Sequence, residues 1–153
     1  MRIEHPALGA LLLMATLGGC AGSGANDEAS ADPAGTLSAL PEGVHWRLQQ
    51  SSIPGLMADS EGAIHLSFAE GRISGDSGCN RFFADAAIVQ GRLQLGPIGA
   101  SKRACIGPRM DAEVALFAAL SQLDGASIVD GKLRLVTRDG AEMHFVDDPT
   151  VAE

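Results

Sequence analysis

Short runs in which apolar and polar residues alternate fill the chain beyond residue 43, and they constrain its fold more than any other feature. In the first run Val44, Trp46 and Leu48 alternate with polar side chains, and residues 64–68 repeat the pattern. A period of two places successive side chains on opposite faces of a strand. Each run therefore predicts an antiparallel strand with one buried and one solvated face.

Turn residues separate these runs and predict hairpins. Glycine follows an acidic or amide residue between successive runs, and such pairs favour tight turns because glycine accepts positive φ at little cost. The C-terminal runs together predict a three-stranded meander. The turns are Glu70-Gly71, Gln90-Gly91, Asp130-Gly131 and Asp139-Gly140, and the runs around them cover residues 63–76, 83–89, 92–95, 127–129, 132–137 and 142–146.

One segment, residues 108–123, has the period of a helix instead. Pro108 suits the first helical position, where a missing N–H costs nothing, and Asp124-Gly125 suits the end. Two adjacent apolar lines predict an amphipathic helix that packs on the concave side of the sheet. The first line is Met110, Val114 and Phe117, and the second is Leu116, Leu120 and Leu123.

The beginning of the chain has the features of an export signal. Arg2 precedes an apolar run of eleven residues, 7–17, and Leu17-Gly18-Gly19-Cys20 follows at once. This order resembles a bacterial lipobox, which implies cleavage of a lipoprotein signal peptide, 1–19, and a lipid anchor on Cys20. The alternatives are an ordinary secretory signal with an incidental cysteine, or a membrane-spanning helix, for which the run is too short.

The next residues predict a tether. Residues 20–41 comprise Cys20 and a segment rich in Ala, Gly, Ser and Asp with no apolar period, so it cannot bury enough surface to fold. One domain follows at 42–148, and 149–153 form a tail. Ala21 stands where an aspartate would resemble an inner-membrane retention signal, so the expected location is the bacterial outer membrane, on its periplasmic face.

Charge limits the partners. The net charge is −8, and it stays −8 after removal of residues 1–19, which hold one Arg and one Glu. Nucleic acid and anionic membrane surfaces attract basic patches, so this balance disfavours both. We expect a monomer that contacts the membrane through the lipid on Cys20 and has an envelope protein as a possible partner.

Two cysteines remain once Cys20 carries a lipid. An even pair in an exported chain predicts a disulfide between Cys79 and Cys105. It would close a loop of about 26 residues and stabilise the fold by about 3 kcal/mol in the chain-entropy model. Two buried free thiols, or one reactive thiol, are the alternatives.

No residue pattern predicts catalysis, a metal or a cofactor. His45, His65 and His144 lie in strand patterns without zinc-site spacing, which favours solvated strand-face positions. The segment 74–78, around Ser77, resembles a nucleophile elbow only loosely, because strand rather than helix follows it. Its glycines are typical of a turn or bulge. We expect no enzyme activity.

Four polar residues remain as candidates for a site. Glu113 lies in the apolar sector of the predicted helix and needs a partner there. The structural interpretation is that it accepts hydrogen bonds from backbone N–H groups or from Lys102 or Arg103, while Asn80 caps a turn. The functional alternative is that Asn80 and Glu113 line a binding cleft.

Several segments between residues 43 and 146 form an ordered set of motifs. The segments are Trp46-Arg47-Leu48, Gly75, Gly78-Cys79-Asn80-Arg81-Phe82-Phe83, Ile98-Gly99, Ala104-Cys105, Met110, Glu113, Phe117, Leu120, Gly131-x-Leu133-x-Leu135 and Phe145. Together they resemble a META domain, the domain of HslJ-like bacterial envelope lipoproteins. Ser101 replaces a common threonine of the family and keeps the hydroxyl.

The resemblance implies an α+β fold, a curved antiparallel sheet or partly open barrel with one amphipathic helix packed on it. It also implies a link to heat shock, motility and novobiocin resistance, with no established catalytic residue. The leading hypothesis is a non-enzymatic outer-membrane lipoprotein that tolerates envelope stress by binding a protein or envelope component. The alternatives are a small-ligand binder or enzyme with a cleft near Asn80 and Glu113, or a lysozyme or protease inhibitor.

Overall fold

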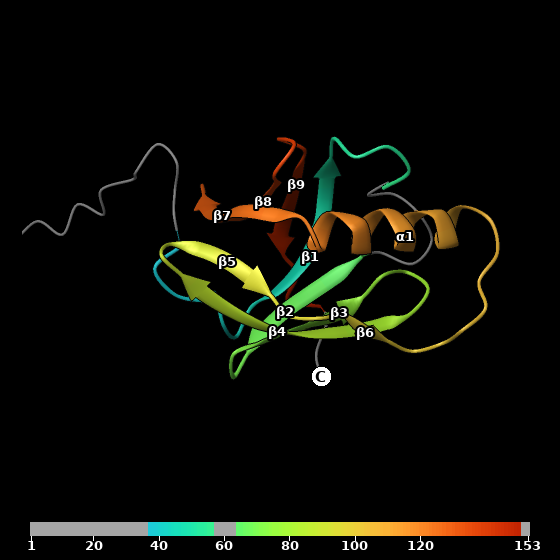
Figure 1. The fold of residues 1–153 in the computed structure, drawn as a ribbon, viewed down its shortest axis with the longest axis horizontal. Coiled ribbons are helices and arrows are strands. Elements are labelled where there is room, and N and C mark those ends of the chain that lie inside the picture. Colours follow the sequence, from blue (N-terminus) through green and yellow to red (C-terminus); the bar gives the residue numbers. More distant parts are fainter. Residues whose placement is uncertain (1–36, 57–63, 151–153) are drawn as a thin grey trace, which may run out of the picture. The chain divides into compact units, whose positions relative to one another are not determined.

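The computed structural model describes residues 37–56 and 64–150, which contain nine strands and one helix (Figure 1). The predicted signal peptide, Cys20 and the tether up to residue 36 lie outside the described residues. The last residues assigned to the tether, 37–41, belong to the folded domain instead, because Leu37 is buried in the core and its N–H donates to the Ala126 carbonyl oxygen. No helix in the described ranges is long and apolar enough to cross a bilayer. The strands are β1 (His45–Ser51), β2 (His65–Ala69), β3 (Arg72–Asp76), β4 (Arg81–Val89), β5 (Arg92–Leu95), β6 (Gly99–Ala100), β7 (Leu123–Val129), β8 (Lys132–Thr137) and β9 (Glu142–Asp147), and the helix is α1 (Pro108–Leu120).

All of these strands pair antiparallel in one sheet. The order is β5-β4-β3-β2-β1-β9-β8-β7, and the short β6 pairs with β4. The two strands at the ends of this order, β5 and β7, lie beside each other, and an ion pair between Arg92 Nη1 and Asp124 Oδ1 at 2.7 Å joins them. The sheet therefore curls into a nearly closed barrel, and the predicted α+β fold is confirmed.

The predicted turns are confirmed in their backbone geometry. Glu70, Gln90 and Asp130 have φ of 50°, 52° and 50°, and the glycine after each also has positive φ. Positive φ at both central residues belongs to the type I′ turn, whose twist matches that of the flanking strands. These turns therefore set the register of the hairpins β2–β3, β4–β5 and β7–β8.

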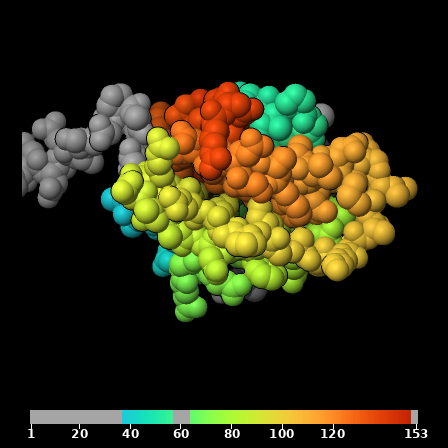
Figure 2. Space-filling model, in the orientation of Figure 1, coloured from blue at the N-terminus to red at the C-terminus, as the bar shows by residue number. Residues whose placement is uncertain are grey.

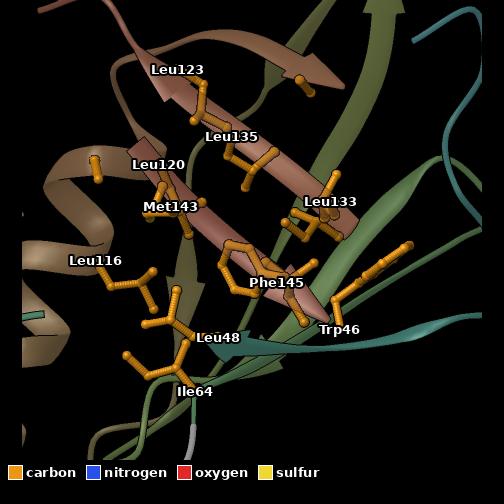
Figure 3. Packing of buried hydrophobic residues seen from close by; sticks show 14 of the residues in the cluster. Trp46, Leu48, Ile64, Leu116, Leu120, Leu123, Leu133, Leu135, Met143 and Phe145 are labelled. Atoms are coloured by element: carbon orange, nitrogen blue, oxygen red, sulfur yellow. The ribbon is translucent and has the colours of Figure 1, made fainter. Parts of the chain in front are cut away.

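The interior of the barrel is filled by the inward-facing side chains of the alternating strands. Leu48, Leu133, Leu135 and Phe145 have no exposed surface. Figure 3 shows Leu116 and Leu120 of α1 directed toward the side chains of the sheet, with Leu120 beside Met143. Burial of each leucine stabilises the fold by about 1.5–3 kcal/mol. One core thus joins the helix to the barrel.

The helix is shorter than predicted. It ends at Leu120, because Leu123 already begins β7. Of its two predicted apolar lines, the second is confirmed, because Leu116 and Leu120 are buried, and the first is wrong at Val114. Val114, placed on the apolar face by the sequence, is 62% exposed, so that assignment was wrong. The buried face contains Ala112 and Ala119, whose small side chains let the helix approach the sheet closely. An alanine adds little to a hydrophobic pattern, so the pattern placed Val114 on the buried face and missed Ala112 and Ala119.

Replacement of the two helix residues tests this face. We expect Leu116→Ala to lower the free energy of unfolding by about 2–5 kcal/mol, because it leaves a cavity in the core. Val114→Ala serves as the matched control on the same helix and should change the free energy by less than about 0.5 kcal/mol. Urea unfolding followed by circular dichroism measures both. A larger loss for Val114→Ala than for Leu116→Ala would contradict the observed helix face.

Candidate functional site

The turn between β3 and β4 buries two polar side chains. The Ser77 N–H donates to the Asn80 carbonyl oxygen at 2.9 Å, and the Asn80 N–H donates back to Ser77 Oγ at 2.9 Å. Gly78, with φ of 84°, lets the chain reverse, and its N–H donates to Asp76 Oδ1 at 2.8 Å. Ser77 and Asn80 are 1% and 3% exposed, so the turn points its polar side chains inward.

Glu113 of α1 meets these two side chains. Ser77 Oγ donates to its Oε2 at 2.5 Å, and Asn80 Nδ2 donates to its Oε1 at 3.0 Å. The predicted partners of Glu113 were therefore wrong, because neither Lys102 nor Arg103 contacts its carboxylate. Ser77, which the sequence offered only as a weak nucleophile, is the residue that sequence reasoning missed. Ser77, Asn80 and Glu113 are called the buried polar cluster below.

Asn80 also holds the loop that leads to the helix. Its Oδ1 accepts hydrogen bonds from Ser101 Oγ at 2.8 Å and from the Arg103 N–H at 2.7 Å. The Ser101 hydroxyl, the group that the change from threonine keeps, thus makes one of these hydrogen bonds. Arg103 contributes only its backbone, while the side chains of Lys102 and Arg103 are exposed. Of the four predicted site residues, Lys102 alone makes none of these contacts.

The predicted disulfide between Cys79 and Cys105 is confirmed. Its Cα atoms are 6.0 Å apart, and it joins the β3–β4 turn to the loop before α1. Both thiols are consumed, which excludes the alternatives of free or reactive cysteines. Figure 2 shows that the segment before α1 and the start of α1 lie together at one end of the domain. The disulfide links this segment to the β3–β4 turn.

The hydrogen bonds of the buried polar cluster indicate a structural role. Each carboxylate oxygen of Glu113 accepts a hydrogen bond, and Ser77 Oγ accepts N–H groups from both Cys79 and Asn80. A serine nucleophile needs an exposed Oγ and a nearby general base. Ser77 is 1% exposed, and no histidine contacts it among the described residues. The geometry thus favours the structural interpretation of Asn80 and Glu113 over the cleft.

His45, His65 and His144, which the structure describes, do not converge on a metal site. Within the described ranges, no cluster of three or more His, Cys, Asp or Glu side chains is placed to hold a metal ion. His144 Nε2 lies 2.9 Å from Glu142 Oε2 on the outer face of the barrel. Arg134, and then His144, lower the pKa of Glu142 from 4.5 to about 2 by hydrogen bonding to it. This cluster is an outer-face ion pair that joins β8 to β9.

An open groove of about 820 Å³ lies over strands β1 to β4, next to the loop before α1. We call it the outer-face groove. Burial lowers the pKa of His65, one of its residues. The sequence did not predict this groove, because it depends on the register of four strands. It is lined by His45, His65, Leu66, Ser67, Ser74, Gly75, Asp76, Gly78, Arg81, Phe82, Phe83, Arg103 and Arg109.

These features define a class of domain: a nearly closed antiparallel barrel with one helix and a disulfide just before that helix. A model of the META domain matches residues 38–150, and the chain belongs to this family. No curated protein matches the chain significantly. Two of the segments that carry the resemblance have a structural role here. Asn80 belongs to the buried polar cluster, and Cys79 and Cys105 form the disulfide.

Two solved structures are similar in fold. An NMR structure of a protein from Burkholderia xenovorans has a TM-score of 0.60 and 21% identity, over 97% of this chain and 99% of that one. A second NMR structure has a TM-score of 0.50 and 21% identity, over 66% of this chain and 86% of that one. At this identity the likeness establishes the fold alone.

A glutamine at position 113 tests the buried polar cluster. We expect Glu113→Gln to lower the free energy of unfolding by about 1–3 kcal/mol, because it removes one of two acceptor oxygens and its NH₂ group would face a donor, either the Ser77 hydroxyl or the Asn80 NH₂ group. Lys102→Gln, in the exposed loop, is the control and should change stability by less than about 0.5 kcal/mol. Urea unfolding measures both. Equal stability of Glu113→Gln and the parent chain would refute the structural role.

Removal of the disulfide should destabilise the domain by about 3 kcal/mol, since the cross-link restricts a loop of 26 residues in the unfolded chain. The double variant Cys79→Ala, Cys105→Ala, made in a Cys20→Ala background, supplies the measurement by urea unfolding with and without reductant. Reductant should lower the stability of the Cys20→Ala parent and leave the double variant unchanged. Thiol labelling of Cys79 and Cys105 in the native parent would contradict the cross-link.

Proposed function

We propose that this chain is a non-enzymatic lipoprotein, anchored in the outer membrane through Cys20, whose META domain binds a protein or envelope component on the periplasmic side. The observation that carries the proposal is the apolar run that ends in Leu17-Gly18-Gly19-Cys20. Residues 21–36 separate this cysteine from the first described residue, Leu37. A composition of this kind suits a tether between a lipid and a folded domain.

The disulfide supports export. Disulfides persist in oxidising compartments such as the bacterial periplasm and are rare in the cytosol. Cys79 and Cys105 are bonded, and they are the remaining cysteines of the chain once Cys20 carries its lipid. A lipid anchor and a structural disulfide are thus both consistent with a domain on the periplasmic side of the membrane.

The state of the polar residues supports binding over catalysis. Ser77, Asn80 and Glu113 are buried and hydrogen-bonded to one another, so a substrate could reach them only if those bonds broke. The outer-face groove, in contrast, presents side chains that are open to solvent. Membership of the META family supports a role in envelope stress and novobiocin tolerance, which such a binding domain would serve.

Loss of the lipidated cysteine tests the anchor. In a bacterial host, we expect the parent chain in the outer-membrane fraction with a lipid-sized addition to its intact mass. Cys20→Ala should lack that addition and leave the outer-membrane fraction, because a single domain without acyl chains has no comparable affinity for lipid. Ala21→Ser is the matched control and should behave as the parent. Retention of Cys20→Ala in the outer membrane would contradict the proposal.

The same strains test the physiological role. A strain that lacks the gene should be more sensitive to novobiocin than its parent, and the parent chain should restore growth. Cys20→Ala should restore growth less well, since its domain no longer lies at the membrane. Equal novobiocin sensitivity with and without the gene would contradict the role in tolerance but not the anchor.

A further inference from the structure

The outer-face groove is formed by two rows of side chains that cross four strands. In one row His45, Ser67, Ser74 and Phe83 are register partners on β1, β2, β3 and β4. Residues two positions along each strand lie on the same face, so the next row follows on the same side of the sheet. That row brings Arg47, His65, Asp76 and Arg81 together.

Unpaired positive charge gathers in this groove. Arg47, in the second row, and Arg72, beside Phe83, form ion pairs with Asp148 and Asp85. Arg92 and Arg134 form ion pairs elsewhere on the domain. Arg81 and Arg103, both exposed and both lining the groove, form no ion pair with any residue that the structure describes. Arg109 also lines it and has a partner of its own.

The opposing charge in the groove is small. Asp76 is the one carboxylate among the described lining residues, and its Oδ1 already accepts the Gly78 N–H at 2.8 Å. Across the whole chain the balance is reversed, with a net charge of −8. A groove with unpaired guanidinium groups in an acidic protein is complementary to an anion.

An aromatic ring lies beside these arginines. Phe83 is 50% exposed, and its ring lies against the backbone of Gly99, where a Cβ atom would come within 2.7 Å of the ring. Arg72 covers the ring at 5.2 Å from its centroid. The ring is therefore held in place from two sides and still presents apolar surface. Nearby, the Ser67 and Ser74 hydroxyls lie 3.3 Å apart and can turn toward a ligand.

We propose that the outer-face groove binds an organic anion, with its phosphate or carboxylate group held by Arg81 and Arg103 and its uncharged part against Phe83. The volume of about 820 Å³ falls in the usual range for small-molecule sites. A guanidinium fork matches the oxygen spacing of both anions and binds them through two parallel hydrogen bonds. The inference rests on the proposed function in treating the domain as a binding module, but it does not depend on the lipid anchor.

Titration with small aromatic anions tests the groove. The full chain carrying Cys20→Ala is titrated with phenyl phosphate, benzoate and phenol by calorimetry and NMR. We expect saturable binding of at least one anion, with shifts confined to the groove, and binding of phenol weaker by about tenfold or more. The tighter anion identifies the charged group. Absence of saturable binding by both anions would overturn the proposal.

Matched arginine variants show whether the anion binds at a specific site in the groove or is attracted by any exposed positive charge. Arg81→Ala and Arg103→Ala should each weaken binding of the tighter anion by about tenfold or more, since each removes a charged hydrogen-bond donor. Arg138→Ala removes an exposed arginine outside the groove and should leave affinity unchanged. Equal losses in all three variants would overturn the proposal. Because Cys20→Ala is used throughout, failure of the anchor would leave this result unaffected.

A competition experiment identifies the source of the anion. Vesicles that contain phosphatidylglycerol are added to the complex with the small anion, and phosphatidylcholine vesicles serve as the control. Displacement by the former alone supports the proposal with a lipid headgroup as ligand. Retention of the small anion with both supports it with a soluble ligand. Displacement by both kinds of vesicle would overturn it, because displacement would then not depend on the net negative charge of the headgroup.

Discussion

The burial of Glu113 is the constraint on which the rest of this domain depends. A carboxylate removed from water costs several kcal/mol unless hydrogen bonds replace those to solvent. Ser77 and Asn80 supply them from a turn 36 and 33 positions earlier in the chain. Because Asn80 also holds the backbone of Arg103, one side chain positions the turn, the loop and the helix relative to one another. The disulfide at Cys79 restricts the same junction covalently.

Most of the architecture could be predicted from local patterns, because alternation and turn chemistry act between neighbours in the sequence. The strands around Leu48, Leu66 and Leu133 lie where the alternation placed them. The helix face could not be predicted as well, since Ala112 and Ala119 are buried but add little to a hydrophobic pattern. Their small size, which lets the helix approach the sheet closely, is not visible in that pattern.

The site shows a different limit of sequence reasoning. That Glu113 required a partner could be predicted from its place in the apolar sector, but the partner's identity depended on how two distant segments meet. Lys102 and Arg103 were the nearest candidates along the chain, whereas Ser77 was nearest in space. The outer-face groove is harder still to predict, because Arg81 and His65 become neighbours only through the register of β2, β3 and β4.

The place of β1 in the sheet has a consequence for how the domain forms. β1 pairs with β2 on one side and with β9 on the other, so Trp46 lies opposite Asp147 at the far end of the chain. Pairings between residues so distant in sequence are slow to form, because a long loop must close first. The pairing of β1 with β9 therefore contributes to slow folding of the domain. While β9 is unpaired, β1 is an unprotected edge of the sheet and is open to pairing with other chains.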